Sequence, residues 1–497
     1  MQNDIAGLEG LLRLLTCVKD KGWSEGYAEH VSRCQLQRNQ YPYTEPLLSL
    51  RQTLDQAKGL MAALNNLRQH LGKEIRSLER RCVPLILEDG INRLPDELLA
   101  HTFEIGRFEE PVYDGEFSIV VSHVSGRFRR VALGTPRLWT GLSSSAHLDQ
   151  TRAFISRSSH LELTVEESGY GMVPVPTRSF LEVLEPLSSR WSMLEISSGV
   201  TVDVIQSLGI TNFPRLRHIA LKCSSDTDLS SWCIPSLSTI EAYGLPFHGL
   251  DWVSLGSRLT SMTLRFDSWR SHSVDVITLS QTLINLKALR ELSLFLSRSW
   301  ATAIADQLHQ AEIPKAQSVN IDTLTLGIQG SPAQSLVAAL YDALSFYTAE
   351  EIRLAIEADG HIIPEDFLLD SQGVFFPHSS TIRLYVHGKC NMSDILVNIA
   401  RHCNLTHTVY LDLPSAYLRE TDEEDLMQIL NSPIRHLYLR NCDMLDKWDV
   451  EELARALISR EDNEGLELLE FTTCKMISEE LLLNLQDELG PKLKWAL

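Results

Sequence analysis

The sequence lacks long hydrophobic runs and paired cysteines. No stretch of its 497 residues approaches the ~20 consecutive apolar residues of a bilayer span, and the N-terminal MQNDIAGLEGLLRLL lacks the basic and long apolar regions of a secretory signal. The nine cysteines are odd in number and widely spread, and no CxxC pair occurs, which is typical of reduced intracellular thiols. We therefore expect no membrane contact and a cytoplasmic or nuclear location.

Positive charge is scarce. The chain has 45 Lys and Arg residues against 65 Asp and Glu residues, which gives a formal net charge of -20 and a pI near 5.3. The resulting field repels phosphate, and no local basic patch offsets it, so we expect no nucleic-acid partner. A basic protein partner suits this charge better.

The motifs of common enzymes are missing. No GxSxG elbow occurs, and the Gly-Lys pairs at 72–73 and 388–389 lack the flanking residues of a phosphate-binding loop. The densest group of metal-ligand side chains is Cys390, His402, Cys403 and His407. Its adjacent His and Cys do not form a standard zinc pair. We expect a non-catalytic protein with no cofactor and no metal, and the rival interpretation is an unrecognised enzyme.

The first 88 residues separate into a linker and a helix. Residues 1–46 carry one helical pattern and then a polar segment broken by proline, which indicates an N-terminal extension and linker. Residues 47–88 form a long amphipathic pattern whose apolar residues begin with the heptad spacing Leu50, Leu54, Ala57, Met61 and Leu64. They continue as Leu67, Leu71, Ile75 and Leu78, with a slip of register. Two interpretations of 47–80 stay open: a dimeric coiled coil, or a lone helix docked on the next domain.

A short strand pattern recurs after Thr140. The template LxxLxL appears at 216–221, 259–264, 289–294, 321–326, 434–439 and 466–471, and weaker copies begin at 191, 237, 349, 379 and 406. Helical stretches lie between many of the copies. The fourth positions of the copies are Leu194, Ile219, Ile240, Met262, Leu292, Leu324, Ile352, Ile382, Val409, Leu437 and Leu469. Strand followed by helix, repeated with one phrase, favours an α/β solenoid over a doubly wound sheet.

These copies resemble an irregular form of the leucine-rich repeat. We assign residues 143–497 to this domain, with the parallel sheet inside and the helices outside. Two copies keep the fuller phrase of the family, in which a Cys or Asn follows the strand, and they place Cys442 and Cys474 at that point. The resemblance implies that both thiols lie buried in turns.

A second set of motifs precedes the repeats, within residues 89–142. The phrase Leu94-Pro95-Asp96-Glu97 reads as a helix start, because proline needs no donor there and acids favour the positive end of the helix dipole. With the apolar residues that follow, this phrase resembles the opening of an F-box, and the later segment from Val124 to Trp139 resembles its second half. Thr102, Ser125, Gly126 and Phe128 depart from the family pattern, and an interior helical glycine costs about 1 kcal/mol. The layout is similar to the expanded F-box families of mushroom-forming fungi.

The resemblance implies a substrate receptor of a cullin-RING (SCF-type) ubiquitin ligase, in which the F-box binds a Skp-type adaptor and, through it, a cullin. Carried over position by position, the adaptor-binding residues are Leu94, Pro95, Leu98, Leu99, Phe103, Val124, Phe128, Leu138 and Trp139. An alternative is that these residues only pack against the first repeats. A scaffold with a degenerate F-box and no ligase role is the corresponding alternative function.

In such a solenoid, the residues between the strand leucines face the concave side. The later repeats are rich in Tyr and Arg there, which are the residue types that dominate interface hot spots. We predict that an unknown protein substrate docks on Arg353, Arg383, Tyr385, Tyr410, Asp412, His436, Tyr438 and Arg440. An ordinary solvated strand face is the alternative.

Overall fold

The computed structural model describes residues 12–13, 15–16, 19–21, 45–109, 115–167, 177–222, 228–243, 251–267, 276–297, 318–358, 363–376, 379–419, 423–458 and 466–496. They belong to two units, Met1–Leu99 and Ala100–Leu497. Most of the extension predicted for 1–46 lies outside the described residues. Across the ranges above, we find no helix with the length and apolar character that crossing a membrane requires.

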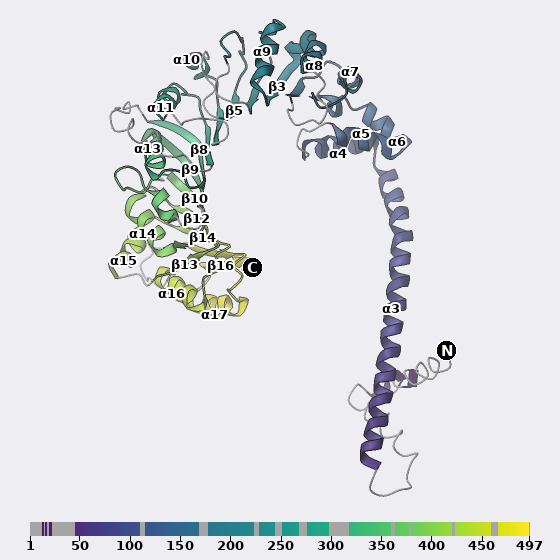
Figure 1. The fold of residues 1–497 in the computed structure, drawn as a ribbon. Helices are drawn as coiled ribbons and strands as arrows, with labels where there is room; N and C mark the ends of the chain where they lie inside the picture. The colour runs from purple at the N-terminus through teal and green to yellow at the C-terminus, as the bar shows by residue number, and fades with distance from the viewer. Residues whose placement is uncertain are drawn as a thin grey trace. The chain divides into compact units, whose positions relative to one another are not determined.

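One long helix, α3 (Glu45–Arg93), makes up most of the described part of the first unit (Figure 1). It contains the helix predicted for 47–88 and continues to Arg93, while the domain boundary at 88 stays a prediction. Described apolar side chains along α3 are between 40% and 61% exposed: Leu54, Met61, Leu64, Leu71, Ile75 and Leu78. A stripe of this kind is a surface that another helix can cover.

Short helices follow α3. They are α4 (Asp96–Glu109), α5 (Glu116–Val124), α6 (Gly126–Leu133) and the 3-10 helix η1 (Pro136–Trp139). Helix α4 begins directly after Pro95, with Asp96 and Glu97 in its first turn, so the predicted helix start is confirmed.

The second unit contains a long parallel sheet. Within the described residues, fourteen strands follow one another in chain order, except that β11 and β13 form a small separate pair. The first seven are β1 (Gly141–Ser143), β2 (Leu163–Glu167), β3 (Trp191–Ile196), β4 (His218–Leu221), β5 (Thr239–Tyr243), β6 (Ser261–Asp267) and β7 (Glu291–Ser297). The others are β8 (Val319–Gly330), β9 (Tyr347–Ala358), β10 (Ser379–His387), β12 (Thr408–Asp412), β14 (His436–Arg440), β15 (Leu468–Thr472) and β16 (Leu493–Ala496). The separate pair is β11 (Cys390–Asn391) with β13 (Ala416–Tyr417).

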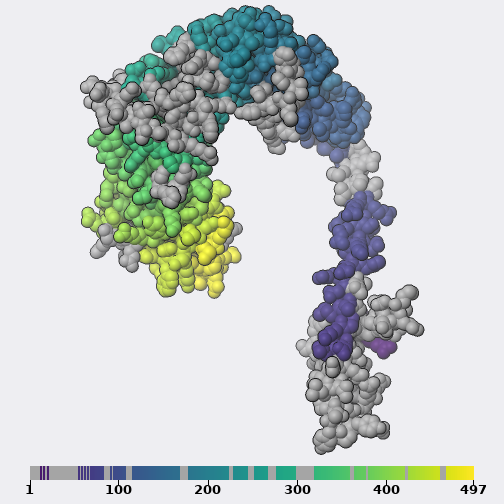
Figure 2. All heavy atoms as spheres, in the orientation of Figure 1, coloured from purple at the N-terminus to yellow at the C-terminus, as the bar shows by residue number. Residues whose placement is uncertain are grey.

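Helices connect the strands and, from β8 onward, lie along the outer side of the sheet (Figure 1). They are α7 (Leu148–Arg157), α8 (Thr177–Leu184), α9 (Gly199–Ser207), α10 (Trp252–Leu255), α11 (Val276–Ile284), α13 (Gln334–Leu344), α14 (Met392–His402), α15 (Glu423–Asn431), α16 (Lys447–Ile458) and α17 (Glu479–Leu489), together with the 3-10 helices η2 (Glu185–Arg190) and η3 (Pro364–Leu368). Drawn with all heavy atoms, the later repeats form a continuous body (Figure 2). Because its parallel strands follow one another in chain order and helices connect many of them, the second unit is an α/β solenoid, as predicted.

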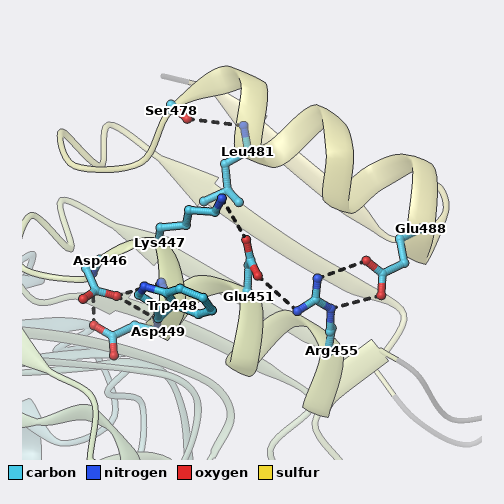
Figure 3. Close-up of polar contacts among 9 residues, drawn as sticks. All are labelled: Asp446, Lys447, Trp448, Asp449, Glu451, Arg455, Ser478, Leu481 and Glu488. Atoms are coloured by element: carbon cyan, nitrogen blue, oxygen red, sulfur yellow. Dashed lines mark hydrogen bonds and ion pairs between the residues drawn. The ribbon is translucent and has the colours of Figure 1, made fainter.

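Ion pairs tie the outer helices of neighbouring repeats together (Figure 3). Arg455 on α16 donates from Nε and Nη2 to the carboxylate of Glu488 on α17, at 3.0 and 3.2 Å. It also pairs within its own helix with Glu451, at 3.1 Å, and Glu451 in turn pairs with Lys447. Because Lys447, Arg455 and Glu488 are exposed, we expect these ion pairs to align the two helices more than to add stability.

The register of the sheet aligns the predicted leucine positions. Each of the eleven fourth positions pairs with the fourth position of the next repeat, in an unbroken series from Leu194 to Leu469. All of them are buried. The same series extends to Leu142 on β1, Val165 on β2 and Leu493 on β16, three strands that the template did not find. Because β1 begins at Gly141, the first strand overlaps the predicted boundary at 142, which itself stays a prediction.

We predict that Leu292→Ala lowers the free energy of unfolding by about 2–5 kcal/mol, because it leaves a cavity in the column of buried fourth-position side chains. The neighbouring column side chains are held on the strands to either side, so they cannot move in to fill the cavity. Urea unfolding followed by circular dichroism measures the change. The matched control is Ser293→Ala, a neighbouring change on the half-buried opposite face of the same strand. Equal effects of the two changes on the free energy of unfolding would contradict the orientation of β7, in which Leu292 is buried and Ser293 lies on the opposite face.

Candidate functional site

Helix α4 has a buried face and an exposed face. Leu99 and Phe103 are one turn apart and buried, whereas Leu98 is 53% exposed. Leu94 and Pro95, which precede the helix, are also exposed. The predicted adaptor-binding residues of this segment therefore include both surface and core side chains.

Helices α5 and α6 meet at a break at Ser125. Ser125 caps α6, and its hydroxyl accepts a hydrogen bond from the backbone N–H of Phe128 at 3.2 Å. Gly126 is consequently the first residue of α6, so the cost of an interior helical glycine does not apply. Val124 ends α5 and is 60% exposed. The ring of Phe128 packs on Phe103, with centroids 5.1 Å apart.

The end of the helical segment is buried against the first repeat. Leu138 and Trp139 are fully buried. The indole N–H of Trp139 donates to the carbonyl oxygen of Ala132 at 2.9 Å, and its ring meets that of Phe154 on α7 edge to face at 4.9 Å. Leu138 and Trp139 are therefore core residues that link α6 to the solenoid.

The predicted substrate residues lie on neighbouring strands of the later repeats. Relative to the buried fourth position of each copy, all of them except His436 occupy the places one and three residues later, which point away from the core. Seven of the eight line one hollow of about 470 Å³: Arg353, Arg383, Tyr385, Tyr410, Asp412, Tyr438 and Arg440. His436 precedes its fourth position and is not among the lining residues; its ring instead lies 3.6 Å from Glu467.

The hollow contains a stack of aromatic and cationic groups. The rings of Tyr410 and Tyr438 are nearly parallel, 4.2 Å apart at an angle of 10°. The guanidinium of Arg383 lies over the other side of Tyr410, with its Cζ atom 3.8 Å from the ring centroid. Such a stack holds a flexible arginine side chain in a single orientation.

A carboxylate anchors the two arginines at one end of the hollow. Glu351 accepts from Arg353 at 3.0 Å and also pairs with Arg383. The hydrogen bond from Arg353 is the main reason why the pKa of Glu351 is lower than its ordinary value. Because this carboxylate is charged at neutral pH and serves two guanidiniums, the trio keeps one net positive charge.

The other end of the hollow is built on Asp412. Its two carboxylate oxygens accept from Asn441 at 3.0 Å, and Arg440 lies 4.0 Å away. Partial burial raises the pKa of Tyr385 and of Tyr438, so both hydroxyls stay protonated at neutral pH and can donate to a ligand.

Several lining residues were missed from the sequence: Thr325, Ala355, Glu470 and Thr472. They occupy the same two outward places of their repeats, and this offset could have identified them. A second hollow of about 320 Å³ lies over earlier strands and includes Arg265 and Phe295, two further outward-facing residues. There the ring of Phe295 covers Gly327, where a side chain would collide with it.

The thiols have a structural position. Cys442 and Cys474 are buried, and each donates to the carbonyl oxygen two residues earlier at 3.4 Å, which confirms their predicted turn position. Contact with the thiol of Cys474, together with burial, raises the pKa of Cys442. Burial also raises the pKa of Cys390 and of Cys403 to about 12. Among the residues that the structure describes, no group of three or more His, Cys, Asp or Glu side chains could hold a metal ion.

No protein-family model matches this chain, and no curated protein matches it. Eleven chains of solved structures match. One belongs to the crystal structure of the Rad7 and Elc1 complex in yeast, with 13% sequence identity and a TM-score of 0.28 over 84% of this chain and 97% of that chain. A likeness at that TM-score carries no inference about this protein.

We predict that alkylation separates the cysteines by burial. Among the six cysteines that the structure describes, iodoacetamide at mildly alkaline pH modifies the exposed Cys82 and Cys233 of the folded chain first. Cys390, Cys403 and Cys442 react at least about a hundredfold more slowly, because the pKa of each of these thiols is raised and the thiolate is the reacting form. Cys474 is also slow, because it is 2% exposed and the reagent cannot reach its sulfur. Peptide mass spectrometry of timed samples measures each rate, and unfolding in urea serves as the control that makes all six equal. Fast labelling of Cys442 in the folded chain would contradict its turn position.

Proposed function

We propose that this chain is a non-catalytic substrate receptor of an SCF-type ubiquitin ligase. The observation that carries the proposal is the order of parts: an F-box-like pair of motifs on short helices, followed directly by an α/β solenoid with a Tyr- and Arg-lined hollow. An adaptor-binding module joined to a capture surface is what a receptor needs, and neither part requires a catalytic residue or a cofactor. We place the protein in the cytoplasm or nucleus.

The adaptor contacts follow from exposure. Leu98 and Val124 are large apolar side chains that are more than half exposed, and Leu94 and Pro95 are exposed beside the helix start. Exposed apolar groups on the surface of short helices are suited to burial by a partner. In this proposal the buried residues of the motif, together with the half-buried Phe128, support the module from inside: Leu99, Phe103, Leu138 and Trp139.

The adaptor is tested with Leu98→Glu. We expect a Skp-type adaptor from the same organism to bind the purified chain, and the variant to raise the dissociation constant by about a hundredfold or more. The reason is that an unpaired charge buried in an interface costs roughly 3–5 kcal/mol. Isothermal titration calorimetry measures both constants.

Leu483→Glu is the matched control for this experiment. Leu483 is a leucine of similar exposure, 49%, on the outer helix α17 of the last repeats. It should leave adaptor binding unchanged. If the folded wild-type chain does not bind the adaptor, that result favours the second candidate function, a leucine-rich-repeat scaffold without a ligase role. One observation favours this candidate: Thr102 is polar and exposed, whereas the F-box pattern has an apolar residue at that position.

The capture surface is tested with the double variant Tyr385→Ala and Tyr438→Ala. Both side chains line the hollow, and aromatic hot spots contribute roughly 2 kcal/mol or more each. We expect proteins that crosslink to the wild-type chain in cells to be depleted at least about tenfold by the double variant, as measured by quantitative mass spectrometry. Tyr417→Ala is the control, because Tyr417 is an exposed tyrosine on β13 and is not among the lining residues. A crosslinking profile that neither variant changes would remove the hollow from the proposal.

A further inference from the structure

Helix α3 carries a seam of heptad positions that is longer than any uninterrupted run of hydrophobic residues at that spacing. Positions that alternate steps of four and three run without interruption through Leu50, Leu54, Ala57, Met61, Leu64, Arg68, Leu71, Ile75, Leu78 and Cys82. Arg68 occupies the heptad position that follows Leu64, where the hydrophobic pattern alone predicted a slip of register to Leu67. That slip is therefore unnecessary, because one polar residue in a heptad seam preserves the register.

The seam positions all belong to one helix. Its described side chains from Leu54 to Cys82 are exposed, including Arg68. Pro84 has no backbone N–H to continue the hydrogen-bond ladder, so we end the seam at Cys82. A long amphipathic helix with an exposed seam gains most of its stability from packing against another helix.

We propose that the seam is covered by a second copy of this chain, in an antiparallel two-stranded coiled coil from Leu50 to Cys82. This alignment places Leu54 opposite Leu78 of the second copy, Met61 opposite its Leu71, and Arg68 opposite its Leu64. Every seam position from Leu50 to Cys82, a segment without proline, then lies opposite a seam position of the second copy. The inference does not depend on the proposed ligase function.

Charge selects the antiparallel direction. A parallel pair would place Arg68 against Arg68 in the middle of the seam, and it would place Glu74 beside Glu79 of the second copy on both flanks. The antiparallel alignment separates the arginines and brings Arg51 beside Glu79 of the second copy on both flanks. Like charges across a seam exclude a pairing, and opposite charges favour it.

The oligomeric state is measured on the full chain by sedimentation equilibrium. We expect a mass twice the 56.1 kDa of the monomer at micromolar concentration. Leu71→Glu, which introduces a charge into the seam of each copy, should raise the dimer dissociation constant by about a hundredfold. Gln69→Glu is the matched control, since it adds the same charge two residues away at an exposed position outside the seam. A monomeric wild-type chain, or equal effects of the two variants, would overturn the proposal.

The direction is measured with charge reversals. In the antiparallel pair, Glu79→Lys weakens the dimer by about tenfold, since two attractive flanking pairs become repulsive, and adding Arg51→Glu restores it. Adding Lys58→Glu instead does not restore it, because position 58 faces Gly72 of the second copy in this alignment. In a parallel pair, Glu79→Lys would strengthen the dimer by relieving Glu74, and that result would overturn the antiparallel arrangement. A wild-type mass of three or four chains would also overturn it.

Discussion

The column of aliphatic side chains that crosses every strand of the sheet is the constraint on which the rest of the solenoid depends. A single repeat has one strand and one short helix, which cannot enclose these side chains alone. Leu292 is buried because Met262 and Leu324 lie on the strands to either side of it. Each repeat is thus stable only through its neighbours, and the column must keep its register across connections of very different length.

That register also determines the chemistry of the concave face. In a parallel sheet, fixing one residue of each strand fixes which residues point outward and which outward residues are neighbours. Arg383, Tyr410 and Tyr438 each follow a column residue by one place, so the column alone brings them into a row. The spacing of neighbouring parallel strands, about 4.8 Å, is close to that of stacked rings, so the stack forms without any distortion of the backbone.

This dependence explains what could be predicted from the sequence. The eleven column positions were predictable because each belongs to a local pattern of six residues. Strands β1 and β2 were not, since β1 has three residues and β2 places Glu166 and Glu167 in buried positions. The outward Tyr and Arg residues were predictable from their offset, whereas His436 has a different offset and does not line the hollow. Ala355 was missed because a hollow forms where side chains are small, and a search for large interface residues passes over such positions.

The charges of the hollow bear on how it recognises a partner. The chain has a net charge of -20, yet the hollow has nearly equal numbers of arginines and carboxylates. The long-range field therefore steers basic proteins toward the chain, but it contributes little selectivity inside the hollow. Selectivity there must come from shape and from hydrogen bonds. Arg383 is already held by Glu351 and Tyr410, so it loses little side-chain entropy when a partner binds. The contacts that hold Arg383 in the free chain are thus what make it a favourable anchor.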